Sequence, residues 1–382
     1  MNYKKLGAYD SQSVNSNSQE LSTAEKNTSC LHIRRKLILN ILAGIAVILI
    51  LLTIMFATTI LIFENVDVQT VKPTTGRSIN INATTTWIQH AITVAGGREG
   101  GRRLNQLYNP DSVYVDDDDR SILIAEWEND RIVKWKYGAT SGQIVAGGNR
   151  RGSRTNQLYN PSYMLVDRKD DSLIICDHGN RRIVRWSRHN SKNGQVLISN
   201  INCLRLAIDN NGDIYYSDPE QHVVRRWTKG DTFGTIVAGG NGQGNNLNQL
   251  NIPTYIFVDE DYSVYVSDSA NHRIIKWLRG AKEGIIVAGG QGDGENVNQL
   301  SYPEGLFVDL SGNIYVADNG NHRIMRWLKE STDGTIILGG NGKGIESTQF
   351  DDLRDLRFDQ HGNLYVIDNG NQRIQKFYIN PN

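Results

Sequence analysis

Three histidines stand at the same position of three successive repeated segments, a pattern that could present imidazoles to a metal. Neutral imidazole is a common zinc ligand. Asp130, Arg181 and Gln372 fill the same position in the other three repeats, however, so the imidazole does not recur in every unit. We therefore expect turn residues here rather than a metal site, and no cofactor. The histidines are His222, His272 and His322.

Two other segments could carry chemistry. The acidic run Asp116 to Asp119 could attract calcium, but it lacks the spacing of an EF-type loop, so a solvated turn is the favoured interpretation. The glycine-rich stretch Gly240 to Gly244 has no Lys-Ser/Thr and no following helix pattern, so it is not a phosphate-binding loop.

The chain has three cysteines, too few for a disulfide framework. Cys176 ends one predicted strand, and Cys203 lies where the first strand of the next repeat begins. The two could pair in an oxidising compartment, and two buried free thiols are the alternative. Cys30 precedes a basic cluster, where a plain thiol or a palmitoylated one is compatible with the sequence.

The elements that must position these residues repeat along the chain. Six segments end on an aromatic residue, with spacings of 51, 41, 50, 50 and 50 residues. A period of this size is typical of propeller blades or solenoid units. Within each segment, short β-branched and aromatic runs alternate with Gly, Asn and Asp clusters, which predicts four strands per unit and no helix. The closing aromatics are Trp135, Trp186, Trp227, Trp277, Trp327 and Phe377.

A turn acid ends one strand of every unit. We expect the Asp318 carboxylate to accept hydrogen bonds from the backbone of the Asn319-Gly320 turn, with Gly320 at positive φ. An arginine follows five residues later in five units, and Val223 replaces it in the third. These residues predict repeated structural ion pairs between blades. The acids are Asp177, Asp218, Asp268, Asp318 and Asp368, with Glu126 in the first unit, and the arginines are Arg131, Arg182, Arg273, Arg323 and Arg373.

The units resemble the NHL repeat, whose core reads Pro-x-Gly-hydrophobic-x-Val-Asp, Gly-Asn-hydrophobic-Tyr-Val-x-Asp and Asn-His-Arg-Ile before an aromatic. Residues 303–327 match this pattern almost throughout, and residues 253–277 and 353–377 match it nearly as well. The resemblance covers residues 87–382 and implies an all-β, six-bladed propeller of four-stranded blades. The third unit is nine residues shorter, which puts its connection and the strand at 195–199 in doubt.

The strand count predicts how the ring closes. The last unit stops at Phe377 without a fourth strand, and one unpaired strand at residues 91–97 precedes the first unit. Pairing this strand with residues 373–378 would complete the last blade and remove an open sheet edge.

Residues 37–63 form a run of 27 residues without a charge, long enough for one transmembrane helix before the propeller. Arg34, Arg35 and Lys36 precede the run, so the positive-inside rule places residues 1–36 in the cytoplasm as a disordered tail. The propeller would then be extracellular or lumenal, behind a polar stalk at residues 64–86. A glycosylation sequon in that stalk starts at Asn82.

The sequence favours a non-enzymatic function. The 41 basic and 41 acidic residues cancel, which argues against nucleic-acid binding. We expect a membrane-anchored recognition or scaffold module that binds a protein or a glycan through its loops. The alternative is a membrane-tethered lyase or lactonase-type hydrolase with Zn or Ca in the channel. Propellers of that kind need blade-specific ligands on the inner strands, and here the inner-strand loops are interpreted as carrying repeat-equivalent residues.

Overall fold

The computed structural model describes residues 35–36, 38–53, 79, 81–97, 99–188 and 192–381. The chain divides into two units, Met1–Lys72 and Pro73–Asn382. In the first, residues 35–36 and 38–53 are helical. Among the described residues, no helix is both long and apolar enough to cross a membrane. Of the predicted span 37–63, residue 37 and residues 54–63 lie outside the described ranges, as do residues 1–34 of the predicted tail and most of the predicted stalk.

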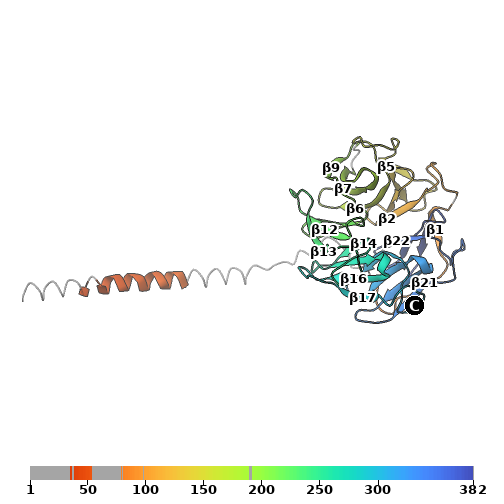
Figure 1. Ribbon diagram of the computed structural model, residues 1–382. Helices are drawn as coiled ribbons and strands as arrows, with labels where there is room; N and C mark the ends of the chain where they lie inside the picture. Colours follow the sequence, from red (N-terminus) through yellow and green to blue (C-terminus); the bar gives the residue numbers. More distant parts are fainter. Residues whose placement is uncertain are drawn as a thin grey trace, which may run out of the picture. The chain divides into compact units, whose positions relative to one another are not determined.

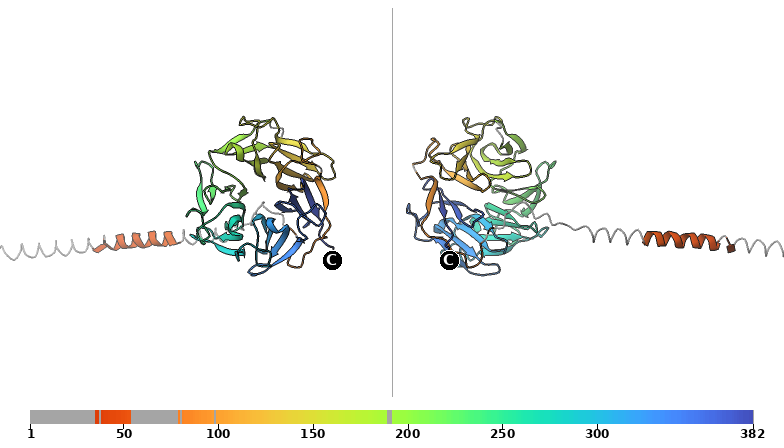
Figure 2. Two further views of the ribbon diagram at one scale, coloured as in Figure 1. Left: turned by 45° about the vertical axis from the view of Figure 1, so that its right-hand side comes forward. Right: turned by 180° about the vertical axis from the view of Figure 1, so that it is seen from behind.

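The second unit confirms the predicted six-bladed propeller of four-stranded antiparallel blades. Figure 2, left, shows the six sheets arranged around a common axis, and Figure 1 labels some of their strands. Three short 3-10 helices, η1 (His178–Asn180), η2 (Ser269–Asn271) and η3 (Asn319–Asn321), lie in turns between second and third strands.

The blades follow one another along the chain, and each runs from the axis outward. Blade 1 is β2 (Pro110–Asp116), β3 (Ser121–Glu126), β4 (Arg131–Lys136) and β5 (Gln143–Gly147). Blade 2 is β6 (Pro161–Asp167), β7 (Ser172–Asp177), β8 (Arg182–Ser187) and β9 (Gln195–Ser199). Blade 3 is β10 (Leu206–Ile208), β11 (Ile214–Asp218), β12 (Val223–Trp227) and β13 (Thr235–Gly239). Blade 4 is β14 (Pro253–Val258), β15 (Val264–Asp268), β16 (Arg273–Trp277) and β17 (Ile285–Gly289). Blade 5 is β18 (Pro303–Val308), β19 (Ile314–Asp318), β20 (Arg323–Trp327) and β21 (Gly334–Gly339). Blade 6 is β22 (Leu353–Phe358), β23 (Leu364–Asp368), β24 (Arg373–Phe377) and β1 (Ile92–Gly96).

The strand register defines two rims of the ring. In blade 5, Pro303 lies opposite Asp318, and Asp318 lies opposite Arg323. This end, where the inner strands begin, is called the proline rim. At the other end Ile314 lies opposite Trp327, and this end is called the tryptophan rim. The turn acids predicted from the sequence therefore all lie on the proline rim.

Ring closure follows the prediction. Strand β1 pairs antiparallel with β24, so the first strand of the propeller completes the last blade. The preceding segment adds a second clasp. Trp87 pairs with Ile379, and its indole N–H donates to the carbonyl of Gly362 at 2.8 Å. Ile81, in the predicted stalk, is buried in the same hydrophobic cluster as Trp87.

Packing between neighbouring blades forms the core. Strands β3 and β7 are buried at every residue, because each is covered by a blade on both faces. One cluster joins Leu123 and Ala125 of β3 to Met164 and Val166 of β6. The closing aromatics of the repeats are all buried, from 0% exposed at Trp327 to 8% at Trp227.

Candidate functional site

An acid–arginine clamp occupies the proline rim of every blade except the third. The acid ends the second strand, and the arginine begins the third strand. The predicted ion pairs thus form within a blade rather than between blades, because the two residues face each other in the strand register. The distances from arginine Nε to the carboxylate are 2.6 Å for Arg182–Asp177, 2.8 Å for Arg273–Asp268, 2.7 Å for Arg323–Asp318 and 2.7 Å for Arg373–Asp368, and Arg131 pairs with Glu126 in blade 1.

The buried carboxylate has further partners. Asp318 accepts hydrogen bonds from the backbone N–H of Ser301 at 2.7 Å and from Nδ2 of Asn321 at 2.8 Å. The expectation that it would bind the backbone of residues 319–320 is wrong, because its oxygens face the incoming loop. Burial raises the pKa of Asp318, and the hydrogen bonds from Ser301, Asn321 and Arg323 oppose that rise.

The guanidinium of each clamp also holds the loop that enters the blade. Arg323 donates to the carbonyls of Glu295 at 2.6 Å, Asn296 at 3.1 Å and Gln299 at 3.2 Å. These residues lie in the connection between β17 of blade 4 and β18 of blade 5. The arginine therefore fixes the glycine-rich connection between two blades, which is how the clamp acts across blades.

Blade 3 lacks the clamp arginine because the connection that enters this blade is short. Residues 200–205 alone connect β9 to β10, whereas residues 290–302 connect β17 to β18. With the long loop absent, an arginine at Val223 would have no loop carbonyls to bind. Asp218 instead accepts hydrogen bonds from the backbone N–H groups of Glu220 and Gln221 at 3.1 and 3.0 Å.

A disulfide stabilises the connection between blades 2 and 3, where the clamp is absent. The structure joins Cys176 of β7 to Cys203 in the short connection, with a Cα–Cα distance of 5.7 Å. Cys203 stands directly before Leu204 and Arg205, at the position where blades 1, 2, 4 and 5 have the proline of the inner strand. Blades 2 and 3 are thus held covalently where the clamp and its loop are missing.

Two of the three recurring histidines make contacts between blades, whereas Nδ1 of His322 has no hydrogen-bond partner in the described chain. Nδ1 of His272 accepts a hydrogen bond from the backbone N–H of Tyr302 at 3.2 Å, and Nδ1 of His222 accepts one from Ile252 at 3.2 Å. Gln372 does the same for Asn109 at 2.6 Å and so links blade 6 to blade 1.

This histidine position, not the glycine, has the left-handed backbone. His322 has φ of 52°, whereas Gly320 is not among the residues with positive φ. Gly320 is required for space, since a Cβ there would lie 2.2 Å from Oγ of Ser301. The prediction of positive φ at Gly320 is therefore wrong. Among the described residues, no group of three or more His, Cys, Asp or Glu side chains could hold a metal ion.

The acidic run lies at the tryptophan rim and is matched by cations. Asp116 pairs with Arg188, and Asp119 pairs with Lys136 and, at 3.3 Å, with Lys134. Although burial acts to raise it, the hydrogen bonds from Lys136 and its neighbours lower the pKa of Asp119 to about 2. A surface hollow of about 400 Å³ beside this run is also lined by Arg168. Asp118 pairs with Arg168 at 3.4 Å, and Asp117 accepts a hydrogen bond from the backbone N–H of Gln360 at 2.8 Å, so each aspartate of the run has a partner within the propeller.

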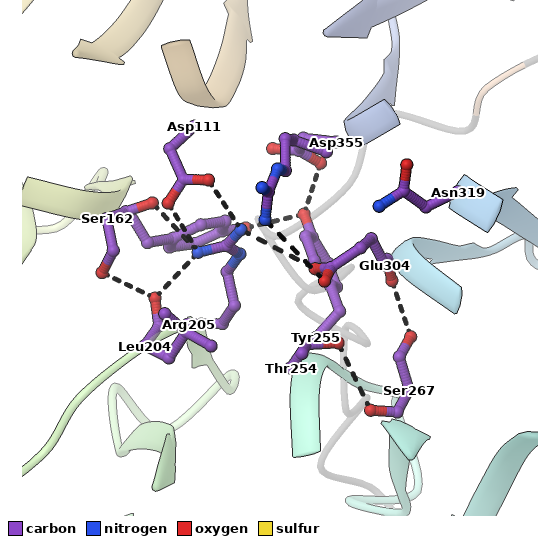
Figure 3. A network of polar contacts seen from close by, with 12 residues as sticks. Asp111, Ser162, Leu204, Arg205, Thr254, Tyr255, Ser267, Glu304, Asn319 and Asp355 are labelled. Carbon is purple, nitrogen blue, oxygen red and sulfur yellow. Dashed lines mark hydrogen bonds and ion pairs between the residues drawn. The ribbon is translucent and has the colours of Figure 1, made fainter. Parts of the chain in front are cut away.

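Blade-specific polar residues line the start of the inner strands. The NHL pattern has glycine two residues after the proline, and blade 5 keeps it at Gly305, where a Cβ would lie 2.9 Å from Cα of Asp355. Four of the other blades replace it with side chains that reach across the axis, as Figure 3 shows for Arg205, Tyr255 and Asp355, whereas Ser112 bonds Met164 of the neighbouring blade. The residues at this position are Ser112, Tyr163, Arg205, Tyr255, Gly305 and Asp355.

Contacts across the axis connect blades that are not neighbours. Arg205 of blade 3 binds Asp111 of blade 1 through both terminal nitrogens, at 3.0 and 3.2 Å. Tyr163 of blade 2 and Tyr255 of blade 4 are joined through their hydroxyls at 3.1 Å, and Tyr255 donates to Asp355 of blade 6 at 2.6 Å. These residues are buried, from 0% exposed at Asp355 to 8% at Asp111, so they close the channel below the proline rim.

Glu304 of blade 5 lies above this closure and is not fully paired. Its carboxylate oxygens lie 4.0 Å from Nη2 of Arg205 and 4.0 Å from Nη1 of Arg354, beyond hydrogen-bond distance. Oε2 is buried and has no hydrogen-bond partner within the described part of the chain. Burial raises the pKa of Glu304 to about 7, although Arg354 and Arg205 oppose the rise.

Sequence reasoning missed this network. The inner strands were interpreted as carrying repeat-equivalent residues, and that interpretation is wrong at the two positions after the proline. The signal was present as departures from Pro-x-Gly, such as Ser162-Tyr163 and Arg354-Asp355. The repeat pattern in the sequence could not predict which of these side chains pair with one another across the propeller axis.

Asn82 of the sequon is exposed at the surface of the propeller unit. Its side-chain oxygen accepts hydrogen bonds from the backbone N–H and the hydroxyl of Thr84 at 2.9 and 2.8 Å. Arg326 donates to the carbonyls of Asn82 and Thr85, at 3.3 and 2.9 Å, and so holds the segment against blade 5.

Comparisons with known proteins agree with this architecture. The NHL repeat family matches residues 300–326 and 350–377, in blades 5 and 6. No curated protein matches the sequence. A structural genomics protein of unknown function from Bacteroides thetaiotaomicron is similar in structure, with 13% identity, a TM-score of 0.61, and coverage of 77% of this chain and 76% of that one.

Two further solved structures share the fold at low identity. An auxiliary nutrient binding protein from Bacteroides thetaiotaomicron has 16% identity, a TM-score of 0.59 and coverage of 76% of each chain. A gluconolactonase from Xanthomonas campestris has 14% identity, a TM-score of 0.51, and coverage of 79% of this chain and 99% of that one. Together with the sheet topology, these comparisons show that the chain carries NHL repeats in a six-bladed β-propeller.

Proposed function

We propose that this chain is a non-enzymatic recognition module that binds a protein or glycan partner at the proline rim of the propeller. The observation that carries the proposal is the set of blade-specific side chains at the start of the inner strands. Asp111, Arg205 and Asp355 are committed to pairs across the axis. Glu304 alone among the acids of this network has an oxygen left without a partner in the described chain. Polar side chains that are only partly paired, at the end of a closed channel, are better suited to binding a partner than to conducting a ligand through the channel or to catalysis.

A metal-dependent lyase or hydrolase is the competing function, and the gluconolactonase similarity shows the fold alone. Metal chemistry of that kind needs several carboxylate or imidazole ligands at one point. The described residues offer no such group, and the channel acids face arginine and tyrosine instead. Turnover of a lactone panel with added Zn²⁺ or Ca²⁺, lost in both Asp111→Asn and Glu304→Gln, would contradict the binding proposal.

A cross-linking experiment tests where the partner binds. A photoreactive amino acid is placed at Trp127 on the proline rim of the full chain, and in a second variant at Glu260 on the tryptophan rim. We expect cross-linked partner from the first position and none from the second, when both variants reach the same expression level. Equal yields from both rims, or none from either, would contradict binding at the proline rim.

We further propose that residues 37–63 anchor the chain in a membrane, with residues 1–36 in the cytoplasm and the propeller outside the cell or in a lumen. Three observations support this topology: the charge-free run after Arg35 and Lys36, the Cys176–Cys203 disulfide, and the exposed sequon at Asn82. Treatment with an N-glycan-specific glycosidase should shift the mobility of the full chain but not of Asn82→Gln. Mobility that is unchanged for both would contradict glycosylation, and a protease that reaches residues 1–36 in intact cells would contradict the orientation.

A further inference from the structure

Exposed arginines gather on the proline rim of blades 1 and 2. The loops that lead into these blades are residues 97–109 and 148–160. The equivalent loops into blades 4 and 5, residues 240–252 and 290–302, contain no Lys or Arg, and the second of them has two acids. The proline rim is therefore basic at blades 1 and 2 and neutral to acidic at blades 4 and 5. The exposed arginines are Arg102, Arg103, Arg150, Arg151 and Arg154.

The clamps hold the backbone of both basic loops. Nη2 of Arg131 donates to the carbonyl of Arg103 at 3.3 Å, and Nη2 of Arg182 donates to the carbonyl of Arg154 at 3.3 Å. Arg103 and Arg154 thus occupy equivalent positions of successive blades, and blades 4 and 5 have asparagine at this position. Two guanidinium groups therefore recur at the spacing of the blades on a backbone that is fixed.

The turn of blade 1 joins the two loops into one surface. Nδ2 of Asn129 in this turn donates to the carbonyl of Gly101 in the first loop at 2.9 Å. Arg151 of the second loop pairs with Asp130 of the same turn at 3.3 Å. The turn begins at Trp127, which is half-buried. The two loops and the turn at residues 127–130 are called the arginine surface.

The acids of the propeller neutralise only part of this surface. The loops and the turn contain six arginines, no lysine and three acids. Arg151 is 48% exposed, pairs with the turn acids Glu128 and Asp130, and stacks over the ring of Tyr159 at 4.5 Å. Four arginines form no ion pair among the residues that the structure describes, so their charges face solvent. They are Arg102, Arg103, Arg150 and Arg154.

Arg150 has a strained backbone. Its φ is 67°, whereas the equivalent positions of the loops into blades 4, 5 and 6 are Gly242, Gly292 and Gly342, with φ of 78°, 82° and 74°. Glycine adopts this left-handed conformation without steric cost, and arginine does not. Strain of this kind often marks a site of function. Because Arg150 is exposed, its charge rather than its packing is what it contributes.

The residue type and its repetition limit the chemistry of the partner. A planar guanidinium binds two oxygens of a sulfate, phosphate or carboxylate at once, and every basic residue of this surface is arginine. Arg103 and Arg154 belong to successive blades, so the surface suits a chain that carries anionic groups at intervals rather than one small anion. The proposed location of the propeller outside the cytoplasm favours a sulfated polysaccharide over a nucleic acid.

We infer that the arginine surface on the proline rim of blades 1 and 2 binds a sulfated polysaccharide, with Arg103, Arg150 and Arg154 contacting sulfates at separate points along the chain. This inference rests on the proposed recognition function and narrows its ligand from a protein or a glycan to a polyanionic glycan.

The test applies the purified full chain to immobilised heparin and to chemically desulfated heparin. We expect binding to heparin alone, with an affinity that falls as salt rises, because binding releases the counterions of the polyanion. The triple variant Arg103→Gln/Arg150→Gly/Arg154→Gln should bind about tenfold more weakly and depend less steeply on salt.

A second triple variant is the matched control. Lys229→Gln/Arg279→Gln/Lys282→Gln removes the same charge from exposed positions on the tryptophan rim and should bind heparin as the unchanged chain does. Thermal unfolding separates binding from folding. Arg150→Gly alone should unfold at the same temperature as the unchanged chain or higher, since it introduces the residue that three other loops have, and it should still weaken heparin binding.

Equal binding to heparin and desulfated heparin, or equal losses in the two triple variants, would overturn the inference. Poly-glutamate that competes as well as heparin would show that the surface takes an acidic peptide and would also overturn it. A partner that cross-links at Trp127 and is not displaced by heparin would overturn this inference alone and leave the broader recognition function intact.

Discussion

Arg205 and Asp111 form a two-point ion pair across the propeller axis, between blades that are separated by blade 2. Arg205 is 1% exposed and Asp111 is 8% exposed, so water screens the pair poorly. Asp111→Ala should lower the free energy of unfolding by about 3–5 kcal/mol, because it leaves an unpaired buried guanidinium. Urea denaturation would measure this loss.

The exposed pair Arg181–Glu220 is the matched control. Its side chains are 52% and 54% exposed, and its closest contact is 3.1 Å. Glu220→Ala should change stability by about 0–1 kcal/mol. Equal losses for Asp111→Ala and Glu220→Ala would show that the pair across the axis adds no more than a surface contact.

Removal of one clamp should loosen one connection. Arg323→Met leaves Asp318 buried without its cation and releases the carbonyls of Glu295, Asn296 and Gln299. We expect a loss of about 3–5 kcal/mol and faster amide hydrogen exchange in residues 290–302. The equivalent loop at residues 240–252, which Arg273 holds, should exchange as before and serves as the internal control.

Val223→Arg provides the reverse test in blade 3. The short connection at residues 200–205 offers no loop for the new guanidinium, so the substitution should not raise the unfolding temperature. A clear rise in the unfolding temperature would mean that the ion pair between arginine and acid stabilises a blade without any contact to the loop.

The disulfide should contribute measurably to stability. Reduction of Cys176–Cys203 is expected to lower the free energy of unfolding by about 2–4 kcal/mol, since the bond closes a loop between residues 27 positions apart. Thermal unfolding with and without a reductant would show the difference. The double variant Cys176→Ser/Cys203→Ser should give one curve under both conditions, whereas a persistent shift would trace the effect to another part of the chain.

Glu304 should make stability depend on pH. Its pKa is raised by burial to about 7 in the folded state, above the ordinary value of 4.5. Between these values the folded state holds a proton that the unfolded state has lost, so stability falls as the pH rises from about 4.5 through 7. The loss attributable to Glu304 is on the order of 3 kcal/mol.

Unfolding temperatures from pH 4.5 to 8 should therefore decline less steeply in Glu304→Gln than in the unchanged chain. Buried clamp acids such as Asp318 also have raised pKa values, and their contribution remains in both proteins. Parallel curves would place the pKa of Glu304 near its ordinary value.

The N-terminal clasp should matter for ring closure. Trp87 is 3% exposed and contacts Tyr315 and Phe358. Trp87→Ala should cost about 3–5 kcal/mol, through lost burial and an unpaired carbonyl at Gly362. Ile88→Ala, at a residue that is 43% exposed, should cost far less, and equal losses would argue against the clasp.

Much of the fold could be predicted from spacing alone. The repeat of closing aromatics, the alternating strand pattern and the missing fourth strand after Phe377 predicted six blades and the pairing of β1 with β24. These features are local in each repeat, and a propeller repeats one local unit around an axis. The short third unit also has a local explanation, because the loss of the loop and the loss of arginine at Val223 occur together.

The turn chemistry was only partly predictable. Sequence placed Asp318 and Arg323 five residues apart, but it could not show that both also bind the incoming loop at Ser301 and Gln299. The left-handed residue was assigned to Gly320 by propensity, whereas the structure puts it at His322 and uses Gly320 to admit Ser301. The close approach of Ser301 to Gly320 therefore outweighed the local tendency of glycine to adopt a positive φ.

What the sequence by itself determined is the repeating unit, because each strand, turn and closing aromatic follows from residues within about fifty positions. What only the tertiary structure decided is the channel. Asp111, Arg205 and Asp355 come from three blades and are far apart in the chain, and nothing in the spacing pairs them. Their meeting depends on how many blades close the ring, since that number sets which inner strands face each other across the axis.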